Sequence, residues 1–299
     1  MRTDEGPRPG MEIDSGKPGS VNGFGGTESP PVLAPFSTYL RRLGVADHAQ
    51  ATSPFDPGLA PVVLESHLEQ SAHLMLSLKI SMSCWLIANE LATRRKLAAA
   101  ARAGVPTIAG GGPYEIAVAQ NQLPAYLELC ADVGFCAIEC GAGFTDPRVK
   151  PSEVVAQAQA HGLGVEFELG SKHDGEFDRR VVRELIDDGK RWLQAGARRL
   201  TVEARESATG IGVFDASGTL NVELAEQLVD GLGLGILTFE APSKRSQFAL
   251  LDHFGPHARL GNIPLDEVLR VEIYRRGLHA DAFGKERLRP RRATEPIVS

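Results

Sequence analysis

Four glutamates stand where short apolar runs of the sequence end, which is the position from which side chains reach the mouth of a parallel β-barrel. They are Glu139 in CAIEC, Glu168 in VEFELGSK, Glu203 in LTVEARES and Glu240 in LTFEAPSK. One such carboxylate is usually a helix cap or a solvated rim residue. Four on consecutive strands would repel one another unless a cation lay among them, and oxygen ligands suit Mg²⁺. The pattern therefore predicts a hard divalent metal.

Three lysines accompany these glutamates. Lys79 lies within an earlier apolar run, and Lys172 and Lys244 each stand four residues beyond one of the glutamates. Because positive charges close to carboxylates favour the ionised form of both groups, these lysines would offset the repulsion at the predicted mouth.

Two glycine-rich segments are candidates for binding an anion. Residues 110–112 are three consecutive glycines, which let backbone N–H groups approach an anion but also serve any tight turn. In RESATGIGVFD, Arg205 can fork onto a carboxylate or phosphate while Gly210 and Gly212 keep the backbone accessible. The alternative for Arg205 is a salt bridge with Glu206 at the rim.

The sequence lacks the patterns of several other enzyme classes. None of the eight histidines forms an HxH or HExxH pair, and no GxSxG motif supports a nucleophilic serine. Among the four cysteines, Cys136 and Cys140 stand in one predicted strand, roughly 13 Å apart, which is too far for a disulfide. Reduced thiols are therefore expected.

The candidate residues lie on short apolar runs that alternate with helical patterns, which is typical of a parallel sheet with helical crossovers. There are eight runs: 62–64, 74–80, 105–108, 135–140, 165–169, 200–202, 235–239 and 259–263. Eight units without a Gly-rich dinucleotide fingerprint favour an α/β fold of the (β/α)₈ TIM-barrel type over an open doubly wound sheet. The first unit is irregular, because only about ten residues separate the first two runs.

Composition divides the chain into three parts. Residues 1–55, rich in Gly, Pro and Ser, are predicted to be a disordered extension, 56–286 the single barrel domain and 287–299 a basic tail. The net charge of −6 gives no reason to expect nucleic acid. We see neither a signal peptide nor an apolar run long enough for a membrane. We therefore expect a cytoplasmic protein with a small-molecule anionic substrate, and a homo-oligomer only by default.

Six longer motifs carry a resemblance to a known family. They are GGGPYE (110–115), ELGSK (168–172), VEARESATGIGVFD (202–215), FEAPSK (239–244), GNIPLDEV (261–268) and RRGLHADAFGK (275–285). Together they resemble the phosphosulfolactate synthase family, from about residue 59 to residue 285. The resemblance implies a (β/α)₈ barrel lyase of sulfonate biosynthesis. Its reaction would be the Mg²⁺-dependent addition of sulfite to phosphoenolpyruvate, or a closely related addition to an enol phosphate.

The resemblance also implies a role for each candidate residue. The metal ligands would be Glu139, Glu168 and Glu240. The catalytic residues would be Lys172, Lys79, Lys244 and Glu203, with Lys172 as the general acid that protonates C2. The substrate-binding residues would be Arg205, Gly111, Gly112, Gly210, Gly212 and Asn262.

Departures from the family pattern fall at the predicted mouth. ESHLEQ (65–70) takes the place of Asp-Lys-Gly after the first strand, and ISMSC (80–84) replaces Phe-Gly-Trp-Gly-Thr after the second. Near the C-terminus LHAD (278–281) replaces Leu-Arg-Gly-Asp. Fewer cations should weaken the binding of two highly charged substrates. Two alternatives stay open: a divergent barrel enzyme with a different nucleophile or acid acceptor, and a non-catalytic stress or ligand-binding protein on the same scaffold.

Overall fold

A closed ring of eight parallel strands forms the centre of the protein. The computed structural model describes residues 36–145, 149–172 and 175–288, and its strands pair in chain order until β8 pairs with β1. The predicted (β/α)₈ barrel is confirmed. The strands are β1 (Thr52–Asp56), β2 (Leu78–Ile80), β3 (Thr107–Ala109), β4 (Ala137–Cys140), β5 (Gly164–Leu169), β6 (Arg199–Val202), β7 (Leu237–Glu240) and β8 (Arg259–Pro264).

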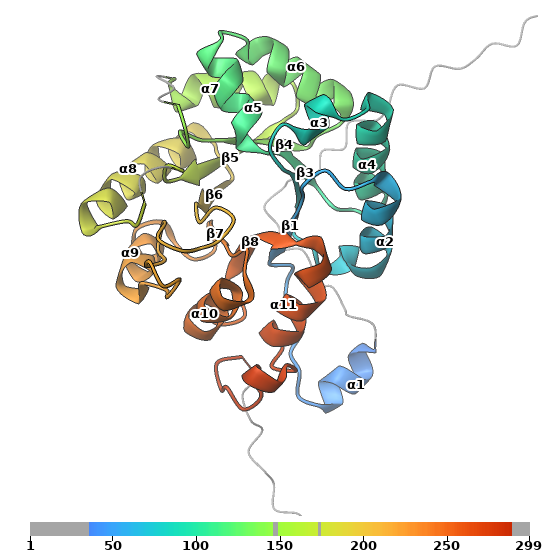
Figure 1. Cartoon of the computed structure of the whole chain (residues 1–299), viewed down its shortest axis with the longest axis vertical. Coiled ribbons are helices and arrows are strands. Elements are labelled where there is room, and N and C mark those ends of the chain that lie inside the picture. The colour runs from blue at the N-terminus through green and yellow to red at the C-terminus, as the bar shows by residue number, and fades with distance from the viewer. Residues whose placement is uncertain (1–35, 146–148, 173–174, 289–299) are drawn as a thin grey trace, which may run out of the picture. The chain divides into compact units, whose positions relative to one another are not determined.

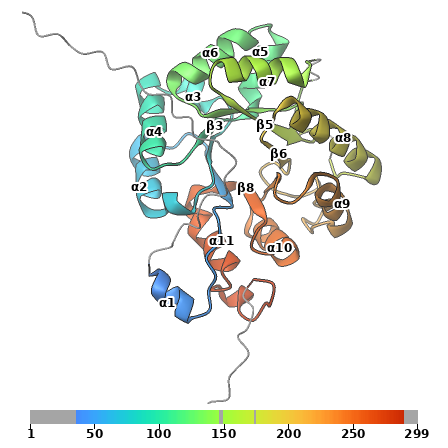
Figure 2. The ribbon, with the colours of Figure 1, turned by 180° about the vertical axis from the view of Figure 1, so that it is seen from behind.

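Helices surround the ring of strands, as Figures 1 and 2 show from opposite sides. They are α1 (Ser37–Arg42), α2 (Pro61–Ser71), α3 (Cys84–Ile87), α4 (Glu90–Arg102), α5 (Gly111–Ala119), α6 (Leu123–Val133), α7 (Pro151–Ala160), α8 (Arg179–Ala195), α9 (Val222–Leu232), α10 (Lys244–Phe254) and α11 (Val268–Arg275). Within the described ranges, no helix is long and apolar enough to cross a membrane. The four cysteines are free thiols, as expected.

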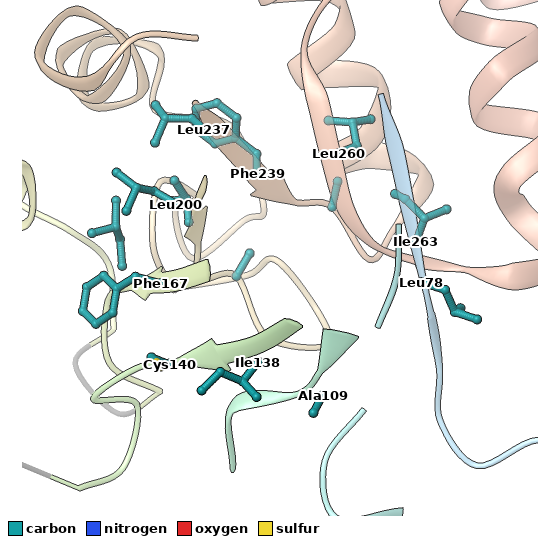
Figure 3. Close-up of a cluster of buried hydrophobic side chains, with 14 of the residues drawn as sticks. Leu78, Ala109, Ile138, Cys140, Phe167, Leu200, Leu237, Phe239, Leu260 and Ile263 are labelled. Carbon is teal, nitrogen blue, oxygen red and sulfur yellow. The ribbon is translucent and has the colours of Figure 1, made fainter. Parts of the chain in front are cut away.

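Alternation along the strands separates an apolar core from a charged barrel interior. Successive side chains of a strand point to opposite faces of the sheet. Phe167 and Phe239 point outward and pack with other buried apolar side chains between the strands and the helices (Figure 3). Their neighbours Glu166, Glu168 and Glu240 therefore point into the barrel. The carboxylates of the predicted site are thus held by the same strands that build the core.

The first barrel unit differs from the prediction. The run 62–64, predicted to be the first strand, lies in α2, so this assignment is wrong. Val62 and Val63 are 61% and 40% exposed on that helix. These apolar residues therefore do not mark a buried strand. Pro61 occupies the first helical turn, where the missing N–H is not needed.

The described part of the barrel begins earlier than predicted. β1 starts at Thr52, within the segment 1–55 that was predicted to be an extension, and α1 also lies in that segment. Residues 1–35 and 289–299 lie outside the described residues, so the predicted disorder and the basic tail stay predictions there.

An irregularity at the closure of the ring accommodates two unusual residues. Thr52 of β1 pairs with Leu260 of β8, and Pro54 pairs with Ile263. Between these two pairs β8 has one residue more than β1. A bulge of this kind is one of the few places where a paired strand accepts a proline, which has no N–H to donate. Within the extra segment, Asn262 adopts a left-handed conformation with φ 50°.

A buried ion pair ties α11 to the same closure. Arg275 is completely buried and donates to the Glu272 carboxylate at 2.9 Å. Its guanidinium also donates to the Pro256 and Ala258 carbonyls at 2.7 Å each and to Thr52 Oγ1 at 3.1 Å. Arg275 therefore links the last helix to the beginning of β1 and to the residue before β8.

Arg275→Met should lower the free energy of unfolding by about 3–5 kcal/mol, because it removes one partner of a buried ion pair. Urea unfolding followed by circular dichroism measures this. Arg180→Met is the matched control, since Arg180 is 73% exposed in its pair with Glu184, and it should cost less than about 1 kcal/mol. Similar small losses in both variants would show that the buried pair does not stabilise the ring.

Candidate active site

Lys79 lies in the middle of the barrel between two of the predicted glutamates. Its Nζ is 3.0 Å from Glu139 Oε2 and 3.1 Å from Glu240 Oε1, and all three side chains are buried or nearly so. Burial alone would lower the pKa of Lys79, but the two carboxylates raise it well above its usual range. Burial would likewise raise the pKa of Glu240, but Lys79 holds it below its usual value. The three groups form a charged bridge across the barrel.

The two carboxylates of this bridge also accept hydrogen bonds from three other parts of the chain: the start of α5, the segment after β6, and β8. The Gly111 N–H donates to Glu139 Oε1 at 3.1 Å, and the Ala204 N–H donates to Glu240 Oε2 at 3.0 Å. The side-chain amide of Asn262, aimed inward by the bulge in β8, donates to Glu240 Oε1. Glu139 and Glu240 are therefore occupied by protein donors.

A second lysine joins the other two glutamates. Lys172 Nζ is 3.4 Å from Glu168 Oε1 and 3.7 Å from Glu203 Oε2. Burial and the neighbouring carboxylates raise the pKa of Glu168 well above its usual range. Burial and the charge of Glu240 raise the pKa of Glu203 to about 7. Glu203 Oε2 is buried and accepts no hydrogen bond within the described part of the chain. This pair can hold a proton or a cation.

Arg205 brings a further positive charge next to this pair. It is held in a left-handed conformation with φ 54°, its backbone N–H donates to Glu203 Oε1 at 2.6 Å, and its Nη1 donates to the Lys172 carbonyl at 3.1 Å. An open cavity of about 460 Å³ lies here, lined by Lys172, Gly175, Arg205, Glu206, Ser207, Thr209, Gly210 and Ile211. The two cations therefore face one space large enough for a small anionic molecule.

The four glycines predicted to bind substrate have different tasks. Gly210, with φ 62°, lines the cavity. Gly212 has the same φ, and a Cβ on it would lie 2.3 Å from the Glu203 carbonyl oxygen, so its loop can pack against β6 only with a glycine there. The Gly111 N–H is used by Glu139, and a Cβ on Gly112 would meet the Phe144 ring at 3.8 Å.

Lys244 is not brought to the buried glutamates in the described structure. It is the first residue of α10, one turn beyond the strand end, and its Nζ pairs with Asp281 at 3.2 Å. Both side chains are about half exposed. The catalytic role of Lys244 therefore stays a prediction without a supporting contact.

Glu115 is a site residue that the sequence analysis did not single out. It is buried in α5, and its Oε2 accepts from the Phe144 N–H at 3.0 Å and from the Thr145 N–H at 2.9 Å. The same loop presents the Gly143 carbonyl to the Lys172 N–H at 2.8 Å. Glu115 thus fixes the loop on which Lys172 rests. Because Glu115 stands on a helix instead of at a strand end, its spacing gave no signal.

The family's first-strand motif is found at a different place from the one predicted. β1 ends at Asp56 and is followed by Pro57 and Gly58, so Asp-Lys-Gly corresponds to these three residues and not to 65–70, which lie in α2. The lysine is still missing, because Pro57 stands there. Asp56 is completely buried and forms an ion pair with Lys96 of α4. This aspartate therefore fixes the fold next to the mouth.

The fit of a metal ion depends on which carboxylate oxygens are available. No group of three or more His, Cys, Asp or Glu side chains among the described residues could hold a metal by itself. Mg²⁺ commonly needs only one or two carboxylates, with water and substrate completing its ligands. Glu168 and Glu203 fit this mode, since Glu203 Oε2 accepts no hydrogen bond in the described ranges. Binding of Mg²⁺ stays a prediction.

These features define a (β/α)₈-barrel enzyme whose mouth gathers buried carboxylates, two lysines and an arginine. The family model of (2R)-phospho-3-sulfolactate synthase matches residues 47–281, and the chain belongs to this family. The phosphosulfolactate synthase of Methanocaldococcus jannaschii is 29% identical over 235 residues, covering 78% of this chain and 94% of that protein. The one of Methanothermobacter thermautotrophicus is 29% identical over 243 residues, covering 79% and 92%.

Among solved structures, the carboxyl transferase domain of Rhizobium etli pyruvate carboxylase, solved with 3-hydroxypyruvate, is similar with a TM-score of 0.51. Its sequence is 11% identical, and the match covers 78% of this chain and 42% of that chain. At this identity the likeness shows the barrel fold alone.

Gly143→Ala should reduce turnover of the family reaction at least about tenfold, because misplacing a catalytic group by 1 Å is enough for such losses. A Cβ there would lie 3.0 Å from Lys172 Cε, 3.1 Å from Glu115 Oε1 and 3.2 Å from Glu168 Oε1. Gly235→Ala is the control, since its Cβ would meet nothing within 4 Å. Turnover and urea unfolding are measured for both variants. Unchanged turnover in Gly143→Ala would refute the tight packing of the loop on Lys172.

Proposed function

We propose that this enzyme joins sulfite to C3 of phosphoenolpyruvate in the presence of Mg²⁺ and forms phosphosulfolactate. The observation that carries the proposal is the convergence of Lys172 and Arg205 on one cavity beside the buried carboxylates of Glu168 and Glu203. Two relatives of about the same length that are named phosphosulfolactate synthases support it.

Substrate binding rests on the two cations of the cavity. The Arg205 guanidinium can fork onto two oxygens of a phosphate or carboxylate, and the left-handed backbone fixes the direction in which it leaves β6. Gly210 adds a stretch of backbone without a side chain on the same wall. A small trianion such as phosphoenolpyruvate is held by this combination of charge and open backbone.

The reaction needs a proton but no leaving group. A sulfur lone pair of sulfite forms the C–S bond at C3, and the electron pair of the double bond moves to C2 and is delocalised onto the substrate carboxylate. Lys172 Nζ then gives a proton to C2. Burial would lower the pKa of Lys172, but Glu168 and Glu203 raise it, so Lys172 is charged at neutral pH. Lys172 then regains a proton from water in the open cavity.

The carboxylates divide into two pairs with separate roles. Glu168 and Glu203 would hold Mg²⁺, which would supply positive charge to stabilise the electron-rich substrate carboxylate. Glu139 and Glu240, fixed by Lys79, hold the loops that surround the cavity. Lys79 itself offsets part of the negative charge of Glu139 and Glu240 below the site, which lessens their repulsion of an anionic substrate.

A second candidate function is a related addition reaction, in which the enzyme uses a nucleophile other than sulfite or an acid acceptor other than phosphoenolpyruvate. Pro57 stands where the family has a lysine, so the β1 side of the mouth has lost a positive charge. On neighbouring loops, Met82 and Phe144 are 59% and 44% exposed. An uncharged, partly apolar wall suits a larger and less charged nucleophile than sulfite.

Phosphorus NMR of the purified protein with phosphoenolpyruvate, sulfite and Mg²⁺ tests the proposal. We expect a new phosphate-ester signal that requires sulfite, disappears on chelation of Mg²⁺ and falls at least about a hundredfold in Lys172→Ala, in line with loss of a general acid. Lys150→Ala is the control, since Lys150 is 78% exposed in its pair with Glu153 and should leave the rate unchanged.

Three outcomes of this experiment are informative. A product formed only with another nucleophile, still dependent on Lys172, would favour the second candidate. A product that survives in Lys172→Ala would show that another residue protonates C2. No consumption of phosphoenolpyruvate with any nucleophile would overturn the proposal.

A further inference from the structure

The amino-terminal half of the barrel interior carries charges that the proposed reaction does not use. Arg199 is the first residue of β6 and Arg259 the first of β8, at the opposite end of the barrel from the mouth. Leu260 points outward into the core (Figure 3), so its neighbour Arg259 points inward. By the same alternation Arg199, next to the buried Leu200, also points inward.

Two guanidinium groups and only one carboxylate, Glu166, lie at this end. Arg199 Nη1 is 3.6 Å from Glu166 Oε1, with side chains 22% and 13% exposed, so solvent reaches the pair. Arg259 forms no ion pair with any described residue. Burial and the nearby charge of Arg199 lower the pKa of Arg259, which reflects an incompletely compensated cation. The three groups together leave one excess positive charge.

A hydroxyl donor lies beside these arginines without a partner. Thr238 pairs with Arg259 in the β7–β8 register, and its Oγ1 is buried and makes no hydrogen bond in the described part of the chain. Gly261 lies next to Thr238 and adds no side chain. A Cβ at this position would lie 3.0 Å from Thr238 Cγ2, so the two residues are close neighbours. Bulky branched residues normally fill the interior of such a barrel. This half instead offers small and polar side chains.

We propose that a small tetrahedral oxyanion, free phosphate or sulfate, binds inside the amino-terminal half of the barrel between Arg199 and Arg259, with Thr238 Oγ1 as a third donor. Guanidinium groups fork onto such oxyanions, and a buried hydroxyl without a partner is stabilised by donating to one. An eight-stranded barrel is only wide enough for side chains or one small ligand, which excludes an extended molecule. This site is independent of the mouth and of the proposed reaction.

Calorimetric titration of the full chain with inorganic phosphate, and separately with sulfate, tests this site at constant ionic strength. Arg205→Gln is used as the background, because it weakens anion binding at the mouth. We expect this background to bind one phosphate or sulfate. Adding Arg259→Gln should weaken binding at least tenfold and adding Thr238→Val about threefold to tenfold, the usual effect of one lost hydrogen bond. Glycerol phosphate, an ester of the same anion, should not bind.

Several results would overturn the site. The first is that Arg205→Gln binds neither phosphate nor sulfate. The second is that Arg259→Gln and Thr238→Val both leave the affinity of Arg205→Gln unchanged. The third is that glycerol phosphate binds as tightly as phosphate. Thermal melts separate binding from a structural role. Phosphate should raise the melting temperature of Arg205→Gln but not of Arg205→Gln/Arg259→Gln. Equal shifts in both would mean that Arg259 only balances the charge of Glu166.

Discussion

The bridge of Lys79 between Glu139 and Glu240 is the interaction on which the rest of the site depends. Buried charges are costly, and they are tolerated only when partners satisfy them. Here the partners are one lysine and donors from the start of α5, the segment after β6, and β8. The requirement to satisfy two carboxylates therefore ties three parts of the mouth to one another. The cavity beside Lys172 and Arg205 is formed on this fixed base.

Charge is unevenly distributed along the barrel axis. The mouth half holds four glutamates with Lys79 and Lys172, an excess of two negative charges if all are ionised. Burial raises the pKa values of Glu168 and Glu203, and this excess of negative charge raises them further. In the proposed function, a divalent cation would relieve this excess and would prepare the mouth for an anionic substrate. The opposite end, with Arg199, Arg259 and Glu166, has the reverse imbalance.

The sequence predicted the barrel and the four glutamates because β4 to β7 are apolar runs with a glutamate as the last or next-to-last residue or directly after the run. β1 was missed because Ser53 and Pro54 interrupt its apolar pattern, and its pairing with β2 and, through a bulge, with β8 makes it a strand. Asn262 was predicted to bind the substrate, but the same bulge turns its side chain toward Glu240. The regular alternation of a strand does not reveal a bulge. Lys244 was placed at the mouth from its distance to a strand end, yet α10 carries it away to Asp281.

A double-mutant cycle on Lys79 and Glu240 tests the central claim most directly. The free energies of unfolding are measured for Lys79→Met, Glu240→Gln and the double variant. The account predicts that Lys79→Met alone costs about 3–5 kcal/mol, because it leaves two buried carboxylates without their cation. It also predicts that the double variant loses clearly less than the sum of the single losses, by about 1 kcal/mol or more. Additive losses would contradict the claim that this bridge holds the mouth together.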